Sequence, residues 1–509
     1  MALILSAALM AAALPAAVFA EPQSVSIGGF LVTGGVQGSD YRLEGGLLKV
    51  MTDTPLTIKN QDPTSPNGTG IQVLAGVHAD VTLSGVNIAA KQPFDIVTNS
   101  QDTAGGAFAT SGDQVQNKTS CHITLADGTD NILDASKSAG KSAMYPGLRC
   151  GEGSILTIDD GVRNMDVNGV PVVPEQGKIG ADVTLVGGRQ LHAGDPIASL
   201  DSNDPGTLTV KGGYRSAAIG SGPRESSGCM TFNGGDITAV AYGPGDNAAG
   251  AGCGIGGGIG GSGTDTNFNA GKIDAYGSYH GAGIGGGCTI YGGMNGLATD
   301  IKIPDAIYNG GVNGAPVQSS TLAGDMTING GLIKAKGYTH GNAIGKGCGG
   351  TNTGKTIKIT GGTVLPDSTL GDPSYHALDI GGTNGYVVVT GGSVRLSGPG
   401  KFDSIPGNGG AYGDDDHSQQ VFMTTIDLSG DEMKNYDIAG FDVKIAGAPN
   451  DYGSPYVLDE NSKLYLWLPK DTAAKRWRWS CRCAKTASAS PKSSIPSLSP
   501  TWPITAPLF

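Results

Sequence analysis

A basic residue recurs four positions before an Ile-Gly step, usually with a tyrosine in front of it. The members of this column are Tyr214, Arg215, Tyr279, His280, His340, Tyr375 and His376. Tyrosine rings stack on the faces of sugars, and imidazole and guanidinium groups donate hydrogen bonds to hydroxyls or carboxylates. If these side chains project from one face of the fold, they predict a glycan-binding surface. If they pack against neighbouring turns, they are structural. A repeated register produces either result, and we favour the structural alternative.

Clusters of carboxylates are the other candidates for chemistry, because many enzymes that cleave polysaccharides use acidic groups with a basic residue, often around calcium. The candidates are Asp127, Asp130 and Asp134; Asp201 and Asp204; and Asp414-Asp415-Asp416-His417. All lie in turn-like or Gly/Pro-rich segments, where aspartate commonly stabilises the turn itself. We therefore predict no catalytic residue and no resident cofactor or metal, and leave open a calcium ion at Asp414 to Asp416.

These residues must be positioned by a repeated strand of apolar-Thr-apolar type that leads into glycine. It occurs as Val81-Thr82-Leu83, Ile123-Thr124-Leu125, Leu156-Thr157-Ile158, Val183-Thr184-Leu185, Leu208-Thr209-Val210 and Met230-Thr231-Phe232, with looser copies to Val387-Val388-Val389. The starts lie 22 to 60 residues apart, which is typical of a solenoid. Asn-Gly-Gly corners follow several copies, and a third segment ends in Ile-Gly. Three short strands per turn predict an all-β, right-handed parallel β-helix.

The domain organisation follows from where this pattern begins and ends. Residues 1–20 are apolar and end in Val18-Phe19-Ala20, which predicts a signal peptide. We expect an N-terminal β cap at 21–60, the β-helix at 61–420 and a small C-terminal β domain at 421–474. The predicted location is therefore extracellular or on the cell surface, with no integral membrane segment in the mature chain.

Composition narrows the class of partner. Glycine supplies 86 of 509 residues, without the spacing of collagen, and hydrophobic residues make up 38%. The net charge is −12 and no basic patch lies within the repeats, so nucleic acid is not an expected partner. A polysaccharide or host glycan is the expected one, and the oligomeric state is left open.

Six of the eight cysteines lie in the repeats, and two of them share a register. Cys288 and Cys348 each follow the isoleucine of an Ile-Gly step by four positions, so they should stack on one face. Disulfides are compatible with export, and buried reduced thiols are an equal alternative. No Cys-x-x-Cys pair occurs, so zinc is not expected.

The segments Asp80 to Ile88 and Ile123 to Thr129, together with the Gly281 to Gly287 turn, resemble repeat-bearing surface proteins of gut Firmicutes and their relatives. These are usually described as carbohydrate-binding-domain or right-handed β-helix proteins. The resemblance covers about residues 24 to 470. It implies a secreted or surface-exposed glycan-binding or adhesion protein without catalysis. A polysaccharide lyase or glycoside hydrolase on the same scaffold is the alternative.

The tail at 475–509 departs from this pattern, with Trp477, Trp479, Cys481 and Cys483 among basic residues. We favour a frameshift near residue 474. Every Trp and Cys codon begins with TG, so a two-base shift turns these four positions into alternating apolar residues, as in a strand. A basic-aromatic membrane-surface tail is the alternative.

Overall fold

The computed structural model describes residues 24–98, 118–136, 144–161, 179–184, 190–194, 205–243, 250–289, 324–368, 377–381, 385–397, 402–403, 410–427, 441–445, 452–453, 461, 463–469 and 477–481. This part of the chain is entirely β-structure and turns, which confirms the all-β prediction. Long, mainly parallel sheets dominate it. None of these residues forms a helix, and hence none forms an apolar helix of membrane-spanning length.

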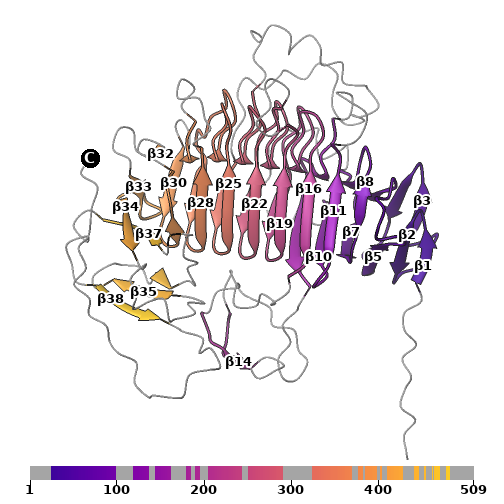
Figure 1. Ribbon diagram of the computed structural model, residues 1–509, viewed down its shortest axis with the longest axis horizontal. Coiled ribbons are helices and arrows are strands. Elements are labelled where there is room, and N and C mark those ends of the chain that lie inside the picture. Colours follow the sequence, from indigo (N-terminus) through magenta and orange to yellow (C-terminus); the bar gives the residue numbers. More distant parts are fainter. Residues whose placement is uncertain are drawn as a thin grey trace, which may run out of the picture.

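Three long sheets carry almost all strands (Figure 1). Sheet A consists, in spatial order, of β1 (Ser24–Ile27), β2 (Phe30–Thr33), β5 (Leu56–Asn60), β7 (His78–Leu83), β10 (Thr119–Leu125), β13 (Ser154–Asp160), β18 (Cys229–Phe232), β21 (Thr266–Phe268), β24 (Met326–Ile328), β27 (Thr356–Ile359), β30 (Tyr386–Val389), β33 (Ala411–Tyr412), β34 (Gln420–Asp427) and β37 (Lys463–Leu468). Sheet B consists of β3 (Tyr41–Glu44), β4 (Leu47–Val50), β6 (Gly70–Val73), β9 (Phe94–Ile96), β12 (Leu148–Cys150), β17 (Ile219–Gly220), β20 (Ile255–Gly256), β23 (Ile284–Gly285), β26 (Ile344–Gly345), β29 (Ile380–Gly381) and β32 (Phe402–Asp403). Sheet C consists of β8 (Asn87–Ala89), β11 (Asp130–Asp134), β16 (Thr207–Lys211), β19 (Asp236–Val240), β22 (Lys272–Tyr276), β25 (Leu332–Lys336), β28 (Thr363–Asp367) and β31 (Ser393–Val394).

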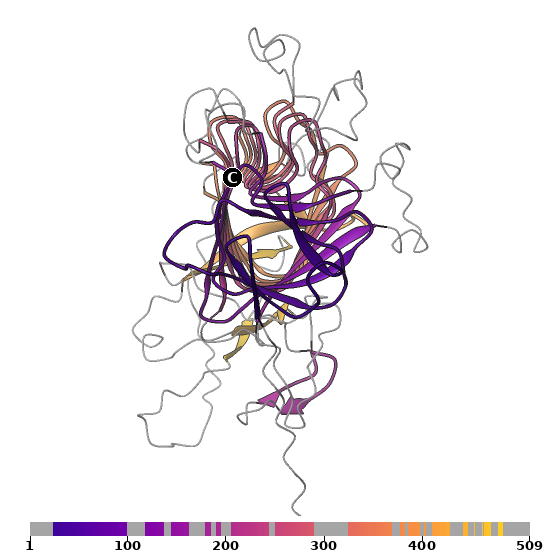
Figure 2. The ribbon, with the colours of Figure 1, turned by 90° about the vertical axis from the view of Figure 1, so that its right-hand side faces the viewer.

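From β7 onward the chain visits the sheets in a fixed order, A then C then B, before returning to A. Each strand pairs in parallel with its counterpart one circuit later, as β10 does with β13 and β22 with β25. Figure 2 looks along the stack from its N-terminal end and shows successive circuits lying nearly over one another. Most copies of the repeated sequence pattern thus stack in sheet A. Two predicted copies do not: Leu208-Thr209-Val210 lies in sheet C, and Val183–Thr184 pairs antiparallel with Gln190–Leu191 in a separate small sheet.

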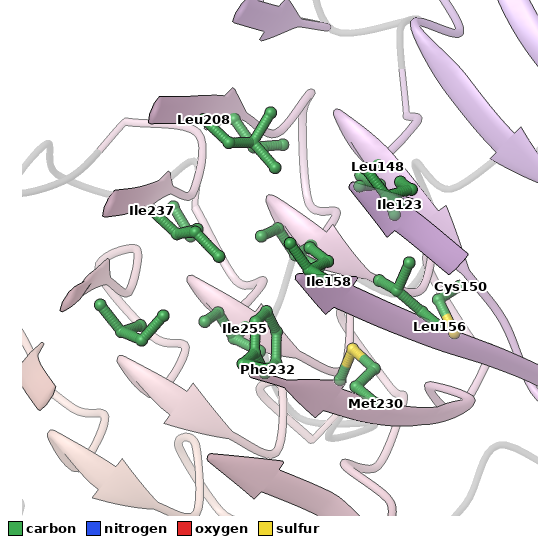
Figure 3. Packing of buried hydrophobic residues seen from close by; sticks show 14 of the residues in the cluster. Ile123, Leu148, Cys150, Leu156, Ile158, Leu208, Met230, Phe232, Ile237 and Ile255 are labelled. Atoms are coloured by element: carbon green, nitrogen blue, oxygen red, sulfur yellow. The ribbon is translucent and has the colours of Figure 1, made fainter. Parts of the chain in front are cut away.

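The core is a set of ladders in which equivalent side chains stack between circuits. In sheet A one ladder contains Val81, Ile123, Ile158, Phe232 and Phe268, paired in that order and all buried. The two phenylalanine rings stack with centroids 4.9 Å apart. Figure 3 shows part of this ladder, with Leu208 and Ile237 of sheet C pointing into the same interior. Because strands alternate in side-chain direction, the threonines between these residues face outward.

The Asn-Gly-Gly corners behave as the sequence predicts. Gly235 and Gly331 both have φ near +80°, a backbone conformation that glycine adopts without strain. The preceding asparagines form a ladder across circuits. Asn269 Nδ2 donates to Asn233 Oδ1 at 2.8 Å, and Asn329 Nδ2 donates to Asn269 Oδ1 at 2.9 Å. Each corner is thereby fixed to the next one along the stack.

The Ile-Gly strands of sheet B bring backbones into contact that no side chain would permit. A Cβ on Gly285, where φ is +130°, would lie 2.0 Å from the carbonyl oxygen of Gly345. Gly220 and Gly256 meet the glycine of the next circuit in the same way. Glycine here is a steric requirement, and it draws the segments on both sides of each strand into tight turns.

Both ends of the stack depart from parallel pairing. At the N-terminal end β1 pairs antiparallel with β2, and β3 with β4. At the other end β33, β34 and β37 are antiparallel, and Trp467 of β37 is fully buried with its Nε1 donating to Val394 O at 3.0 Å. Two small sheets lie apart from these: β14 (Val183–Thr184) with β15 (Gln190–Leu191), and β35 (Phe441–Ile445) with β36 (Tyr452–Gly453) and β38 (Trp477–Cys481).

Candidate functional site

The segments before and after each Ile-Gly strand form two columns that face each other. The residue four positions after one isoleucine hydrogen-bonds to the residue four positions before the isoleucine of the previous circuit. The contacts are Ile259 N to Arg215 O at 2.9 Å, Cys288 N to Ala251 O at 2.9 Å and Cys348 N to His280 O at 2.8 Å. The predicted Tyr/basic column therefore lies beside the cysteine register of the following circuit.

The first members of the column are interior. Tyr214 and Arg215 are 6% and 5% exposed. The Arg215 guanidinium carbon lies 4.7 Å from the Tyr214 ring centroid, a cation–π contact. Tyr214 also packs edge-on against Tyr242. Arg215 has φ of +60°, and its buried Nε has no hydrogen-bond partner in the described part of the chain. These two side chains pack between turns, as in the structural alternative, and their glycan-binding role stays a prediction.

The next two members meet directly across circuits. The Nδ1 atoms of His280 and His340 lie 2.7 Å apart, with one ring donating to the other. Tyr279, which is half-buried, packs its ring edge-to-face against both histidines, at centroid distances of 4.6 and 5.0 Å. His280 is 7% exposed and His340 is half-buried. The ring of Tyr279 thus packs edge-to-face against a pair of hydrogen-bonded histidines.

Two thiols complete this cluster. Cys348 hydrogen-bonds to both Cys288 and His280, and ligand atoms of His280, His340 and Cys348 lie within 4.8 Å of one another. The hydrogen bond from Cys288 is the main cause that lowers the pKa of Cys348, to about 4, with the histidines adding to it. The pKa of Cys288 is raised, because it holds the shared proton and is buried. We call His280, His340, Cys288 and Cys348 the His/Cys cluster.

The sequence predicts the two columns of this arrangement but not the contact between them. The histidine column and the shared register of Cys288 and Cys348 were both predicted, and the two cysteines do lie on adjacent circuits, since β23 pairs with β26. What was missed is that the two columns face each other with an offset of one circuit. The equal count of four residues on either side of the isoleucine could have suggested it. Tyr375 and His376 lie outside the described residues.

A second aromatic group lies on the outer face of sheet A near its C-terminal end. Tyr386 of β30 is 38% exposed and stacks on His417 with centroids 4.0 Å apart and planes inclined by 9°. Tyr412 of β33 packs against both rings. Val388, on the same face and paired with Tyr412, is fully buried. We call Tyr386, Tyr412 and His417 the aromatic platform.

The turn that carries His417 is built by Asp414. Its carboxylate accepts hydrogen bonds from Ser418 N at 2.8 Å, Gln419 N at 3.1 Å and the Ser418 hydroxyl. These bonds, the hydroxyl first, lower the pKa of Asp414. Asp415 forms an ion pair with Lys358 at 2.7 Å. Asp414 therefore acts as a turn aspartate, and calcium binding at this turn stays a prediction.

The other acidic candidates also make local contacts. Asp134 accepts from Ser136 N at 2.9 Å, and Asp130 accepts from the Thr207 hydroxyl at 2.8 Å. Asp201 and Asp204 lie outside the described residues. A different acidic group was not predicted: His122 of β10 lies 3.6 Å from Asp80 Oδ1 and 3.6 Å from Asp159 Oδ2 on the open face of sheet A. His122 thus links β10 to its two neighbours, β7 and β13. The alternation of inward and outward side chains along these strands could have indicated that the three residues share the outer face.

Comparisons with protein families, with curated proteins and with solved structures found no match for this chain. The chemistry must therefore be inferred from the residues themselves.

Proposed function

We propose that this protein is an extracellular, non-catalytic glycan-binding or adhesion protein, of the type that the resemblance to repeat-bearing surface proteins implies. The observation that carries the proposal is the aromatic platform, because Tyr386 leaves a large flat ring open to solvent on a rigid sheet. Most of the other aromatic rings of the stack are enclosed. Tyr386 packs against His417 and Tyr412 and still keeps part of its ring exposed, and exposed aromatic surface commonly marks binding sites.

The geometry of the platform suits a sugar. Tyr386 and His417 are stacked rings with nearly parallel planes, so the outer ring can lie against the apolar face of a pyranose. Lys358 and Asp415 stand next to the platform and present a cation and a carboxylate at its edge. Such groups exchange hydrogen bonds with the hydroxyls that project from the rim of a sugar ring. The platform therefore combines an apolar surface with polar groups at its border.

The scaffold supports this use. We infer that the stacked circuits form a right-handed parallel β-helix, since strand, crossover and parallel strand in one sheet are right-handed in almost all proteins. Parallel pairing fixes Tyr386 in register with Thr356, and Val388 with Lys358. Side chains held on strands lose little conformational freedom when a ligand binds. A long polymer lying along sheet A would also pass other circuits of the same stack.

The catalytic alternative has one observation in its favour. His122 lies between the carboxylates of Asp80 and Asp159 on the same outer face of sheet A, and a base flanked by acids is a common arrangement in hydrolases and lyases. Asp159 and Asp80 are both partly exposed, so this group resembles a solvated surface network more than an enclosed active site. We keep it as the second candidate.

A glycan array probed with the full chain tests the proposal, run beside assays for reducing sugar and for unsaturated uronate on the same polysaccharides. We expect binding to a restricted set of glycans and no product in either assay. Tyr386→Ala should reduce binding at least about fivefold, whereas Leu43→Ala, an exposed apolar residue at the other end of the stack, should not. Product formation that disappears in His122→Gln would support the enzyme instead. Absence of any glycan binding would contradict the proposal.

A further inference from the structure

The His/Cys cluster has a composition that packing alone does not require. Two imidazoles and the Cys348 thiol converge, and Cys288 hydrogen-bonds to Cys348. The equivalent column positions of the preceding circuit carry the apolar residues Ala251 and Ile259, which pack against the two cysteines. Where the preceding circuit has apolar side chains, the cluster therefore has four side chains that can each bind a soft or borderline metal ion.

We propose that His280, His340, Cys348 and Cys288 form a zinc-type metal site that links two adjacent circuits of the stack. Zinc binds imidazole nitrogen and thiolate sulfur in tetrahedral geometry, at about 2.0 to 2.3 Å, so its ligand atoms lie about 3.3 to 3.8 Å from one another. The three described ligand atoms already fall within 4.8 Å of one another. Cys288 is not part of that group of three, but it hydrogen-bonds to Cys348 and its thiol donates to Thr289 O at 3.3 Å; it is the residue we assign as the fourth ligand.

The types of ligand atom in the cluster fit zinc and do not fit a hard cation. Calcium and magnesium need several oxygen ligands, whereas the cluster offers nitrogen and sulfur. The backbone around it is held by interstrand bonds, including Cys348 N to His280 O and Thr289 N to Cys348 O, each at 2.8 Å. The ligands thus project from a backbone that is already fixed. A site with four protein ligands and little solvent is structural in zinc proteins.

The site lies between two circuits that are far apart in sequence, so a metal ion bound there would link them. His280 and Cys288 flank β23, while His340 and Cys348 flank β26, and the two strands are paired although 60 residues separate the histidines. The excursion between these two circuits is a long one, although the earlier one between Ile158 and Phe232 is longer. A metal ion that joins the two sides closes a long loop, which is where such a clip offsets the most chain entropy. The site does not depend on glycan binding.

Zinc binding by the reduced full chain is the direct test, with ZnCl₂ as the probe and a chromophoric chelator as competitor. We expect one tightly bound ion per chain and a rise in melting temperature when zinc is added. Cys348→Ser and His340→Gln should each weaken zinc binding at least about 100-fold. Matched controls are Cys253→Ser, a buried thiol of the same sheet region, and His78→Gln, a surface histidine; both should bind zinc like the wild type.

Cobalt(II) provides a readout that does not depend on the variants folding. The wild-type chain loaded with cobalt should show a thiolate-to-cobalt charge-transfer band and the strong visible bands of tetrahedral cobalt. Failure of the reduced wild-type chain to bind zinc or cobalt stoichiometrically would overturn the proposal. So would zinc binding that persists in both Cys348→Ser and His340→Gln. A Cys288–Cys348 disulfide whose reduction does not restore zinc binding would assign these cysteines to a covalent link instead.

Discussion

Two groups of stacked histidine and tyrosine rings occur in this molecule, and they differ in almost everything except their residue types. The buried His280 packs against the half-buried His340 and hydrogen-bonds to the thiol of Cys348. Tyr386, by contrast, is exposed on the outer face of sheet A and stacks on the half-buried His417, whose turn also carries Asp415, the partner of Lys358. Ring spacings are similar, at 4.6 and 4.0 Å. Burial and neighbours, and not the type of residue, are the grounds on which we propose metal ligation for the first group and sugar contact for the second.

The difference arises from the local backbone. The enclosed group grows from turns on either side of an Ile-Gly strand, where the backbone contact between glycines draws two columns together. The open group comes from β30, β33 and the turn that carries His417; on β30 only Tyr386 is exposed, and the three valines after it are buried. Turns that fold over a two-residue strand bury their side chains, whereas successive side chains of a strand point to opposite faces, which leaves Tyr386 on the outer one.

The largest effect should come from the glycine contact that creates the enclosed columns. Gly285→Ala would place a Cβ 2.0 Å from the carbonyl oxygen of Gly345 in a backbone conformation strained for alanine. We expect the free energy of unfolding to fall by more than about 4 kcal/mol, measured by chemical denaturation followed by circular dichroism. Gly68→Ala is the control, since nothing lies within 4 Å of its added Cβ. Equal stability of the two variants would mean that the circuits are not in backbone contact.

A smaller effect should separate the two tyrosines. Tyr279→Ala removes the ring that packs against both histidines of the enclosed group, so we expect a loss of about 1 to 3 kcal/mol in unfolding free energy. Tyr386→Ala removes an exposed ring and should cost less than about 1 kcal/mol. Thermal and urea unfolding of the two variants measure the difference. The reverse order would place Tyr279 on the open face predicted from the sequence and would weaken the comparison.

The smallest effect concerns the turn beneath the aromatic platform. Asp414→Ala removes the acceptor for three hydrogen bonds that shape the turn and hold His417, so glycan binding should weaken by about two- to fivefold. Asp416→Ala, a neighbouring exposed residue in the same turn, should leave binding unchanged. Titration of both variants with the same glycan checks this. If added calcium strengthened glycan binding in the wild type but not in Asp414→Ala, the turn would instead be assigned to calcium.

Much of the fold could be predicted from the sequence because the same short motifs recur along the chain. Val81-Thr82-Leu83 and Ile123-Thr124-Leu125 pair in the predicted register, and the Asn-Gly-Gly corners adopt the predicted positive φ. The stacking of Ile284 on Ile344 also followed from counting. Each of these features follows from a short motif that recurs along the chain, so that equivalent residues of different circuits can be matched by counting. The right-handed winding and the domain boundaries remain predictions.

The candidate sites were harder to predict, because they depend on which columns face each other. Whether Tyr214 points outward or inward depends on the path of the turn after β16, which no local pattern specifies. The contact between His280 and Cys348 requires an offset of one circuit between the columns. The platform joins Tyr386 to Tyr412 and His417 through a turn near the end of the stack, where the repeat has already ceased. The sequence provides the spacing within each column, but it does not specify the offset between columns, the direction of Tyr214 or the end of the stack that forms the platform.

The most direct measurement is the dissociation constant of the full chain for a glycan selected on the array, compared among wild type, Tyr386→Ala and Tyr386→Trp. At equal melting temperature, we expect the alanine variant to bind at least about fivefold more weakly and the tryptophan variant to bind as well as the wild type, because a large flat ring is what the sugar contacts. Unchanged affinity in Tyr386→Ala, with loss of affinity in Tyr279→Ala, would contradict the assignment of the open aromatic platform to glycan binding.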